Sequence, residues 1–274
     1  MRVENTENPR IGVLLVCKNE VEALTETAPQ MRRILDSDSR LYELYLDGNS
    51  EDGSLEILRS LGLRVQLEGP GGLRGALDQA ANHLVDAGCK YILFAQPDGN
   101  CDLEAIPQLV ETCLVDSCDL VVASRYLDDA VSHDDNLVSK LGNKIFTFTA
   151  NLLTGRRFTD VMVGFRIVSV KSLVNSNIMA ASNYSRVERI FSTSVSWDPL
   201  MSVRGGLLGW NIGEIPVSEP ARLGGDMKRS SLRWGGAYMA QILYEGVKTH
   251  LDRFRNRRRR PVDHAHLDGS RVHD

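Results

Sequence analysis

Five short apolar segments, four of them followed by a polar turn, constrain the fold of this 274-residue chain more than any other feature. They are rich in β-branched residues and show little polar alternation, which is typical of strands buried on both faces of a sheet. Alternation of such strands with helical patterns predicts an α/β fold, with a doubly wound, mostly parallel sheet and helices on both faces. The predicted strands are 11–17, 41–46, 63–68, 90–95 and 119–124.

Helical patterns fill the intervals between these strands and dominate the second half of the chain. Their apolar positions recur at the spacing of an amphipathic helix. The predicted helices are 20–35, 54–62, 76–88, 103–115, 137–154 and 230–254, and a further strand is predicted at 207–220.

No linker long enough to separate two folding units interrupts this pattern. We therefore expect one domain over residues 1–254, with a first half at about 9–128 and a second half at about 129–254. The segment 255–274 is strongly basic and poor in apolar residues, which predicts a disordered tail.

Composition excludes several classes of protein. The net charge of −4 provides no global positive field for nucleic acid, so we expect no nucleic-acid partner. No apolar run approaches the roughly 20 residues of a membrane helix, and the first ten residues lack the apolar core of a secretory signal. An odd number of cysteines without metal-ligand spacing indicates reduced thiols in a cytoplasmic protein. These cysteines are Cys17, Cys89, Cys101, Cys113 and Cys118.

Polar turns follow four of the predicted strands. In a doubly wound sheet, ligands bind beyond the carboxyl ends of the strands, so the shared location makes each turn a candidate for a binding site. The turns are Lys18-Asn19-Glu20, Asp47-Gly48-Asn49-Ser50, Gln96-Pro97-Asp98 and Ser124-Arg125-Tyr126.

Seven motifs occur in a family-like order: VCKNE, LDGNSEDGS, GLRGALDQA, QPDGNCD, ASRY, FTDVMVGFRI and EIPVSEPARLGGDMK. On these motifs, over roughly residues 9–245, the chain resembles the family 2 glycosyltransferases, which have the Rossmann-like GT-A fold. Within that family it looks most like the dolichol-phosphate mannose synthase and polyprenyl-phosphate glycosyltransferase branch.

The resemblance implies an inverting glycosyltransferase. Such an enzyme moves a hexose from a nucleoside-diphosphate sugar, here GDP-mannose or a UDP-sugar, to an acceptor, with a polyprenyl phosphate as the first choice. Two alternatives stay open: a soluble alcohol acceptor in natural-product or polysaccharide biosynthesis, and a non-catalytic relative that only binds nucleotide sugars.

Several residues match the nucleotide-binding positions of that family. The acid of the Asn-Glu pair would accept the ribose hydroxyls, although Asn19 and Glu20 would also serve as helix caps. Arg74, at the start of a predicted helix, would hold a phosphate or simply be solvated. The nucleotide-binding positions implied are Cys17, Glu20, Asp47, Arg74, Gly75, Gln96 and Pro97.

The turn after the fourth strand matches the family's metal-binding Asp-x-Asp, with a departure. Asp98 matches the second acid, the usual direct ligand, and Asn100 a further oxygen donor, whereas Gln96 replaces the first acid. The resemblance therefore implies a weakened site for Mg²⁺ or Mn²⁺, because Mg²⁺ can be held by one carboxylate together with substrate phosphates. Asp102 is expected to cap the helix that begins at Leu103.

The Asp-x-x-x-Gly-Phe-Arg signature places Asp160 and Arg166 beside the reacting centre, together with Asp98. Asp160 would be a base or would orient the acceptor, and Arg166 would hold a phosphate. A base is needed for an alcohol acceptor but not for a phosphate, which is already an anion. The alternative is a buried Asp160–Arg166 ion pair.

The remaining matches concern phosphates, the acceptor and the membrane. Arg125, Asp198, Arg222 and Lys228 match positions that contact donor or acceptor. The arginine run at 255–260 is expected to bring a cytoplasmic protein to the inner face of the membrane, because each basic side chain gains about 1 kcal/mol near an anionic leaflet.

Overall fold

The structure is a computed structural model that describes residues 9–69, 71–223 and 231–259, and the side chains in these ranges except 231 and 252–259. Lys228 and the segment 260–274 therefore lie outside the described residues. Within the described part, no helix is both long and apolar enough to cross a membrane.

One mixed, mostly parallel sheet organises the described residues. Its seven strands lie in the order β3-β2-β1-β4-β6-β5-β7, and only β6 runs antiparallel to its neighbours, β4 and β5. The predicted α/β class is confirmed. The strands are β1 (Ile11–Cys17), β2 (Leu41–Asp47), β3 (Val65–Leu67), β4 (Tyr91–Ala95), β5 (Leu120–Ser124), β6 (Arg166–Ser169) and β7 (Ile212–Pro216).

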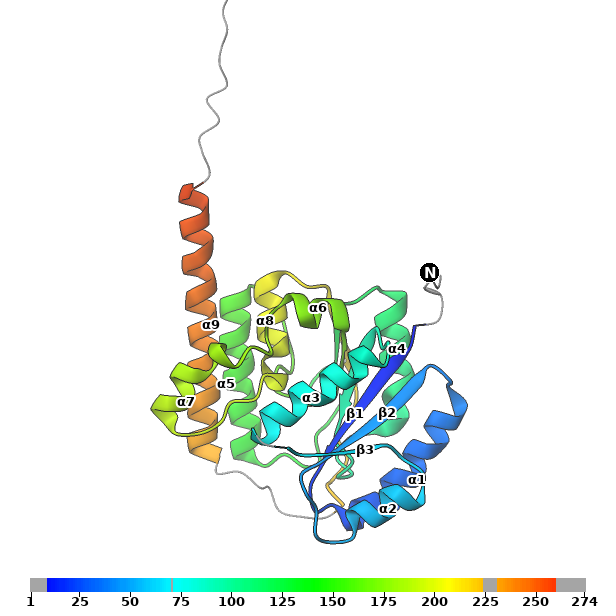
Figure 1. The fold of residues 1–274 in the computed structure, drawn as a ribbon. Coiled ribbons are helices and arrows are strands. Elements are labelled where there is room, and N and C mark those ends of the chain that lie inside the picture. Colours follow the sequence, from blue (N-terminus) through cyan, green and yellow to red (C-terminus); the bar gives the residue numbers. More distant parts are fainter. Residues whose placement is uncertain (1–8, 70, 224–230, 260–274) are drawn as a thin grey trace, which may run out of the picture.

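Helices cover both faces of this sheet. Figure 1 shows α3 across the near face and α4 behind the strands, while α5, α8 and α9 stand together at the side, where they contact one another. The helices are α1 (Val21–Ser37), α2 (Ser54–Ser60), α3 (Gly72–Asp86), α4 (Ile106–Val115), α5 (Leu137–Thr154), α6 (Val170–Asn175), α7 (Ser185–Phe191), α8 (Met201–Leu208) and α9 (Ser231–Arg259), with short 3₁₀ turns at Leu103–Ala105, Ala181–Asn183 and Asp198–Leu200.

The register of the parallel strands brings their carboxyl ends to one edge. Cys17 at the end of β1 lies opposite Asp47 at the end of β2, and Leu15 lies opposite Ala95 at the end of β4. The β-branched and leucine side chains of β1 are buried because helices cover both faces. The polar turns after these strands therefore meet at one site.

One prediction about the second half was wrong in its bounds. The apolar residues at 207–208 belong to α8, and the strand predicted at 207–220 is only Ile212–Pro216. Gly209, with φ of 81°, ends α8 in the left-handed conformation. A short apolar run does not by itself distinguish a buried helix end from a strand.

Two further differences concern segment ends. Strand β6, a four-residue segment, was not predicted; it is buried because it inserts between β4 and β5. The last helix continues past the predicted end at 254, and its backbone reaches Arg259.

All five cysteines are free, in agreement with the prediction of reduced thiols. Burial raises the pKa of Cys113 to about 12, which keeps that thiol protonated and unreactive at neutral pH.

A buried ion pair joins α8 to α9. Two guanidinium nitrogens of Arg204 each lie 2.7 Å from a carboxylate oxygen of Glu245. Gln241 donates a hydrogen bond to the same carboxylate. Glu245 is almost fully buried, so its charge depends on this partner.

We predict that Glu245→Ala lowers the free energy of unfolding by about 3 kcal/mol, because Arg204 is left as a buried charge without its carboxylate. The double variant Arg204→Met/Glu245→Leu should recover most of this loss, since it removes both charges and fills the space. Urea unfolding of both proteins makes the measurement. Equal stability of Glu245→Ala and wild type would contradict the prediction.

Candidate functional site

The ends of β1 and β2 form one side of the site. Asp47 is fully buried, and its carboxylate accepts hydrogen bonds from the Ser50 backbone N–H (2.8 Å) and the Ser50 hydroxyl (2.6 Å). The Cys17 thiol donates to the same carboxylate at 3.6 Å. The structure thus brings Cys17 and Asp47 together, and Asp47 holds the shape of the turn that follows β2.

Glu20 is buried at the start of α1 but does not cap it. The first backbone N–H of the helix, that of Val21, donates instead to Asp52 at 2.9 Å. Asn19 accepts from the Glu51 backbone rather than from the helix. The capping alternative for Asn19 and Glu20 is therefore wrong, and the Glu20 carboxylate lies close enough to Asp98 to raise its pKa.

Asp98 is a buried carboxylate that already faces a cation. Its Oδ2 lies 2.7 Å from Nη1 of Arg222, and its backbone carbonyl accepts from Leu223 N–H at 3.1 Å. Burial raises the pKa of Asp98, and Arg222 opposes this shift. The segment that carries Arg222 and Leu223 therefore closes directly over the turn.

Glycine at position 99 is required by this closure. Gly99 has φ of 87°, and a Cβ atom there would lie 2.4 Å from Cγ of Leu223. On its other side the turn is anchored by Thr27 of α1, whose hydroxyl donates to the Pro97 carbonyl at 2.9 Å. The turn is thus fixed between α1 and the 220–223 segment.

The residues around Asp98 fit a divalent cation that gains most of its ligands from a substrate. Asp98 would supply one carboxylate, and Gln96 and Asn100, two positions before and after it in the sequence, would supply amide oxygens. The described residues contain no cluster of three or more His, Cys, Asp or Glu that would hold a metal by itself. In this structure the guanidinium of Arg222 is the cation that contacts Asp98 Oδ2, so this oxygen is placed to bind a positively charged group.

Asp160 is fully buried and paired with Arg125 at the end of β5. The pair is bidentate, with Nε–Oδ2 of 2.7 Å and Nη2–Oδ1 of 3.1 Å. Arg125 also contacts Glu219 at 3.3 Å. The proposed Asp160–Arg166 ion pair is therefore wrong, and Arg125 holds carboxylates in this structure.

Arg166 is a fully buried cation with unused hydrogen-bonding capacity. Its Nη1 donates to the Ser202 hydroxyl at 3.4 Å, while Nε and Nη2 find no partner within the described residues. Burial lowers its pKa to about 10, against the opposing effect of Asp198 and Asp160. Two unsatisfied guanidinium donors at the centre of the sheet suit a bound anion.

Arg74 and Gly75 lie in the first turn of α3. Arg74 pairs with Glu188 of α7 and donates to the Val195 carbonyl at 3.3 Å. The alternative that Arg74 is simply solvated is wrong. Asp102 accepts from Glu104 N–H at 3.2 Å and caps the 3₁₀ turn at Leu103, as predicted.

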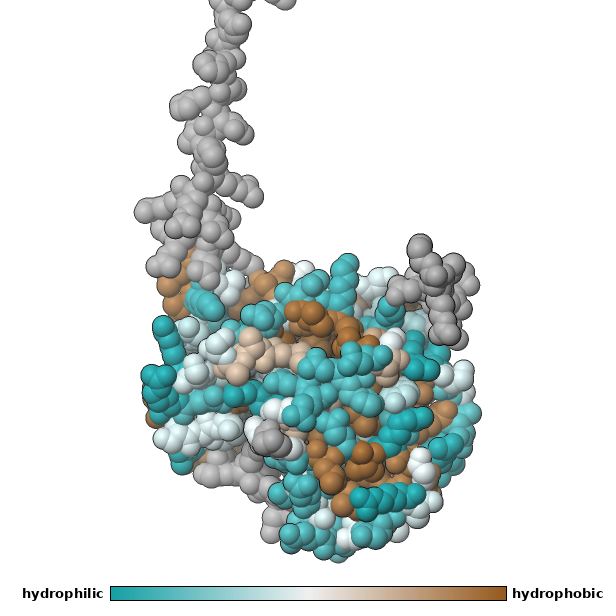
Figure 2. All heavy atoms as spheres, viewed as in Figure 1, coloured by the Kyte–Doolittle hydropathy of each residue, from teal (hydrophilic) through white to brown (hydrophobic). Residues whose placement is uncertain are grey.

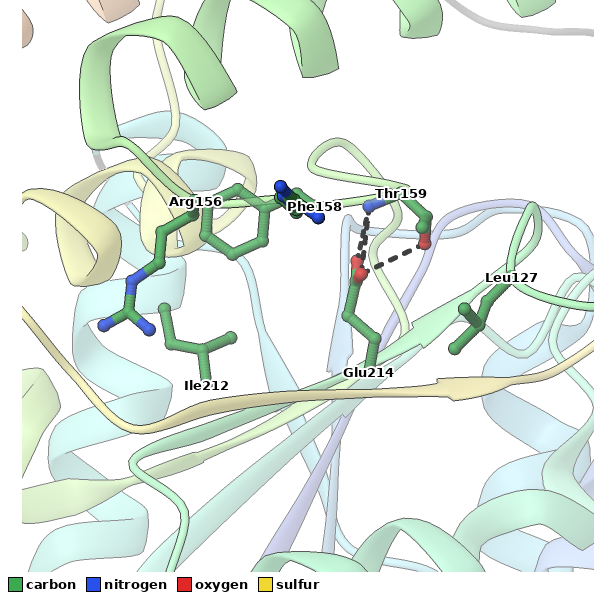
Figure 3. Close-up of a pocket in the computed structure, with 7 residues that line it drawn as sticks. Leu127, Arg156, Phe158, Thr159, Ile212 and Glu214 are labelled. Atoms are coloured by element: carbon green, nitrogen blue, oxygen red, sulfur yellow. Dashed lines mark hydrogen bonds between the residues drawn. The ribbon is translucent and has the colours of Figure 1, made fainter.

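Two glutamates of β7 and its following loop were missed by the sequence analysis. Glu214 accepts from the backbone N–H of Thr159 (2.9 Å) and of Asp160 (3.2 Å), and from the Thr159 hydroxyl at 3.1 Å. Figure 3 shows the contacts between Glu214 and Thr159, beside a hollow whose walls include Arg156, Phe158 and Leu127. Glu214 thus fixes the backbone that presents Asp160, while Glu219 binds Arg125. Both lie in the motif EIPVSEP. The position of this motif at the end of a predicted strand could have identified the two glutamates as site residues.

Comparison with known proteins shows the family of this chain. Residues 13–175 match the family model described as Glycosyl transferase family 2, more than half of the chain. Glycosyltransferase AglJ of Haloferax volcanii is 22% identical over 241 residues, which cover 88% of this chain and 73% of that protein.

Solved structures share the fold. Mannosyl-3-phosphoglycerate synthase from Rubrobacter xylanophilus has a TM-score of 0.55 at 16% identity, covering 96% of this chain and 79% of that one. Glucosyl-3-phosphoglycerate synthase from Mycobacterium tuberculosis, in complex with phosphoglyceric acid, has a TM-score of 0.59 at 15% identity, covering 88% and 81%.

We predict that Arg222→Gln tightens Mn²⁺ binding in the absence of any donor. Arg222 competes for Asp98 Oδ2, and a close charge contact near a protein surface is worth on the order of 1 kcal/mol or more, so a roughly fivefold lower Kd is expected. Isothermal titration calorimetry measures it. Arg32→Gln, which breaks an exposed pair on α1, is the control and should change nothing. An unchanged Kd in Arg222→Gln would refute the competition.

Proposed function

The chain belongs to glycosyl transferase family 2, and we propose that within it this enzyme moves a hexose, with inversion, from GDP-mannose or a UDP-sugar to a polyprenyl phosphate. The observation that carries the proposal is the bidentate Arg125–Asp160 pair. A carboxylate whose two oxygens both bind a guanidinium is poorly placed to take a proton from an alcohol. A phosphate acceptor needs no such base.

The proposed reaction is a single in-line displacement. A phosphate oxygen of the acceptor forms the new bond to the anomeric carbon of the sugar. The bond from that carbon to the nucleoside diphosphate breaks, and the leaving oxygen keeps the electron pair. No proton has to be removed from the acceptor, and no covalent enzyme intermediate forms.

Residues at the carboxyl ends of β1, β2 and β4 are proposed to bind the donor. Glu20 would accept the ribose hydroxyls, since it caps no helix and lies at the sheet edge with Cys17 and Asp47. Mg²⁺ or Mn²⁺, held by Asp98, Asn100 and Gln96, would supply positive charge for the leaving diphosphate. A solved structure of the M. tuberculosis glucosyl-3-phosphoglycerate synthase with Mn²⁺ and UDP-glucose shares this fold, which supports the proposal.

The acceptor phosphate is proposed to meet Arg166. Its two donors without partners would donate hydrogen bonds to the phosphate of the acceptor. When no anion is bound, the negative charge of Asp198 favours the charged form of Arg166. Arg222, once released from Asp98, is proposed to contact a donor phosphate, and Lys228 follows in the same segment. Closure of that segment would exclude water from the reacting centre.

The first experiment is a thermal-shift panel of UDP-, GDP- and dTDP-sugars with and without Mn²⁺, followed by transfer assays. A donor at a hundredfold excess over its Kd should stabilise the fold by about 2.7 kcal/mol. Transfer of the stabilising donor's sugar to a short-chain polyprenyl phosphate supports the proposal. Transfer only to alcohols would favour the soluble acceptor, and binding without transfer would favour a non-catalytic relative.

We predict that Asp98→Ala loses the Mn²⁺-dependent part of donor stabilisation and lowers kcat/KM by more than about tenfold, or roughly 1.4 kcal/mol of transition-state stabilisation. The reason is that Asp98 is the carboxylate that faces a cation in this site. Asp102→Ala is the matched control, because Asp102 caps a turn four positions further along and should retain activity. Retained activity in Asp98→Ala would rule out the metal assignment.

We predict that Arg166→Met keeps or raises the melting temperature but lowers transfer at least about tenfold. When a buried charge has two donors without hydrogen-bond partners, its replacement by an apolar side chain of similar length is often neutral or stabilising. Thermal unfolding and steady-state kinetics separate the two effects. A folded variant with normal kcat and KM would show that Arg166 contacts no acceptor.

A further inference from the structure

Helix α5 has its polarity reversed relative to an ordinary surface helix. Its buried positions are small or polar, namely Asn143, Thr147 and Ala150. Six of its large apolar side chains point outward, with exposed fractions from 50% at Ile145 to 87% at Leu137, whereas Phe146 and Leu153 are partly buried. An ordinary surface helix buries its large apolar side chains and exposes its polar ones. The outward apolar residues are Leu137, Val138, Leu141, Ile145, Phe148 and Leu152.

These six side chains form one continuous stripe. At 3.6 residues per turn they occupy an arc of about 100° along the whole length of the helix. Single exposed hydrophobic residues are ordinary on protein surfaces, whereas a contiguous apolar stripe marks an interaction surface.

Helix α9 widens this stripe. The two helices lie side by side and run in the same direction: Phe146 contacts Gly235, Leu153 contacts Gly246, and His250 lies 3.1 Å from the Leu153 carbonyl. Around the axis of α9, the exposed residues Leu243, Val247 and Leu251 lie about 90° from the side that contacts α5. Around the axis of α5, the apolar stripe lies about 120° from the side that contacts α9, in the opposite sense of rotation. The two sets of apolar side chains therefore face the same side of the helix pair. Figure 2 shows hydrophobic atoms on the part of α9 that precedes the grey segment. We call this surface the α5–α9 face.

Among the described side chains of the two helices, the exposed charges that border the α5–α9 face are basic. Lys140 and Lys144 lie on α5, which contains no acidic residue, and Lys248 lies on α9. Glu245, the acidic side chain described on α9, is buried against Arg204. This positive border contrasts with the net charge of −4 for the whole chain. Apposed copies of the face would place lysines against lysines, whereas an anionic lipid surface is complementary to it.

The α5–α9 face begins at the site. Asp134, shortly before α5, lies 3.6 Å from Arg222, which in turn pairs with Asp98. Leu137 and Leu232, both at the starts of their helices, are the most exposed apolar residues of the face. Apolar surface therefore extends from the edge of the site along both helices, whose side-by-side course is drawn in Figure 1.

We propose that the α5–α9 face binds the surface of an anionic lipid bilayer, with both helices at the boundary between head groups and acyl chains. Lysine side chains at the border contact lipid phosphates, while the apolar stripe enters the bilayer edge. The start of the face then holds the site at the membrane surface, where the phosphate of a polyprenyl acceptor lies; this last point rests on the proposed function. The arginine run that follows in the sequence would add to the attraction, although its side chains lie outside the described residues.

The test is co-sedimentation of the full chain with vesicles of phosphatidylcholine alone or mixed equally with phosphatidylglycerol. Leu141→Gln/Phe148→Gln removes apolar surface from the face, and Lys140→Glu/Lys144→Glu reverses its charge. Val115→Gln, at an apolar residue 76% exposed at the end of α4, is the matched control. All three variants change exposed side chains, so their melting temperatures should match wild type.

Wild type and Val115→Gln are expected to bind the anionic vesicles. The apolar double variant should bind about tenfold more weakly or worse, because two partly inserted side chains are lost. The charge variant should lose the preference for phosphatidylglycerol. Equal sedimentation of wild type and the apolar variant overturns the proposal. So does light scattering that shows a wild-type dimer which Leu141→Gln/Phe148→Gln converts to a monomer.

The outcome is separable from the proposed function. These vesicles contain neither donor nor polyprenyl phosphate, so lipid binding is measured whatever the acceptor is. Conversely, transfer to a water-soluble short-chain polyprenyl phosphate needs no bilayer and should be equal in wild type and Leu141→Gln/Phe148→Gln. Binding to vesicles without any transfer would therefore reject the proposed function alone.

Discussion

The buried charge of Asp160 constrains the second half of the structure. A carboxylate with no exposed surface has to be paired, and Arg125 supplies both of its hydrogen bonds. That pair joins the end of β5 to the loop before β6. Glu214 of β7 then holds the backbone N–H groups of the same loop, and Glu219 holds Arg125 from the other side. The buried charge of Asp160 thus determines how four segments of the chain are held together.

This arrangement bears directly on chemistry. A carboxylate that is oriented and neutralised by an arginine is suited to positioning, and the unsatisfied charge nearby belongs to Arg166. The two arginines therefore differ although their strands, β5 and β6, are neighbours in the sheet. Arg125 is saturated by carboxylates, whereas Arg166 retains donors that a bound anion would satisfy. For this reason we propose an anionic acceptor rather than an alcohol.

The Asp98 turn shows how a site with a reduced number of acids is organised. Because position 96 is a glutamine and not an acid, Asp98 is the carboxylate of this turn that would face a metal ion. In this structure Arg222 neutralises that carboxylate. The segment that carries Arg222 also packs Leu223 against Gly99. The same segment therefore covers the turn and neutralises the Asp98 carboxylate.

The sequence by itself determined the alternation of strands and helices, the meeting of Cys17, Asp47 and Asp98 at one sheet edge, and the family. It did so because apolar periodicity is local and because parallel strands place their ends together. Only the tertiary structure decided which charges pair. Asp160 binds Arg125 instead of Arg166, and Arg74 binds Glu188, across 35 and 114 positions of the chain. The reversed polarity of α5 was also invisible, since periodicity shows that one face is apolar but not which face the rest of the fold covers. Such choices depend on distances between segments remote in sequence, which no local pattern records.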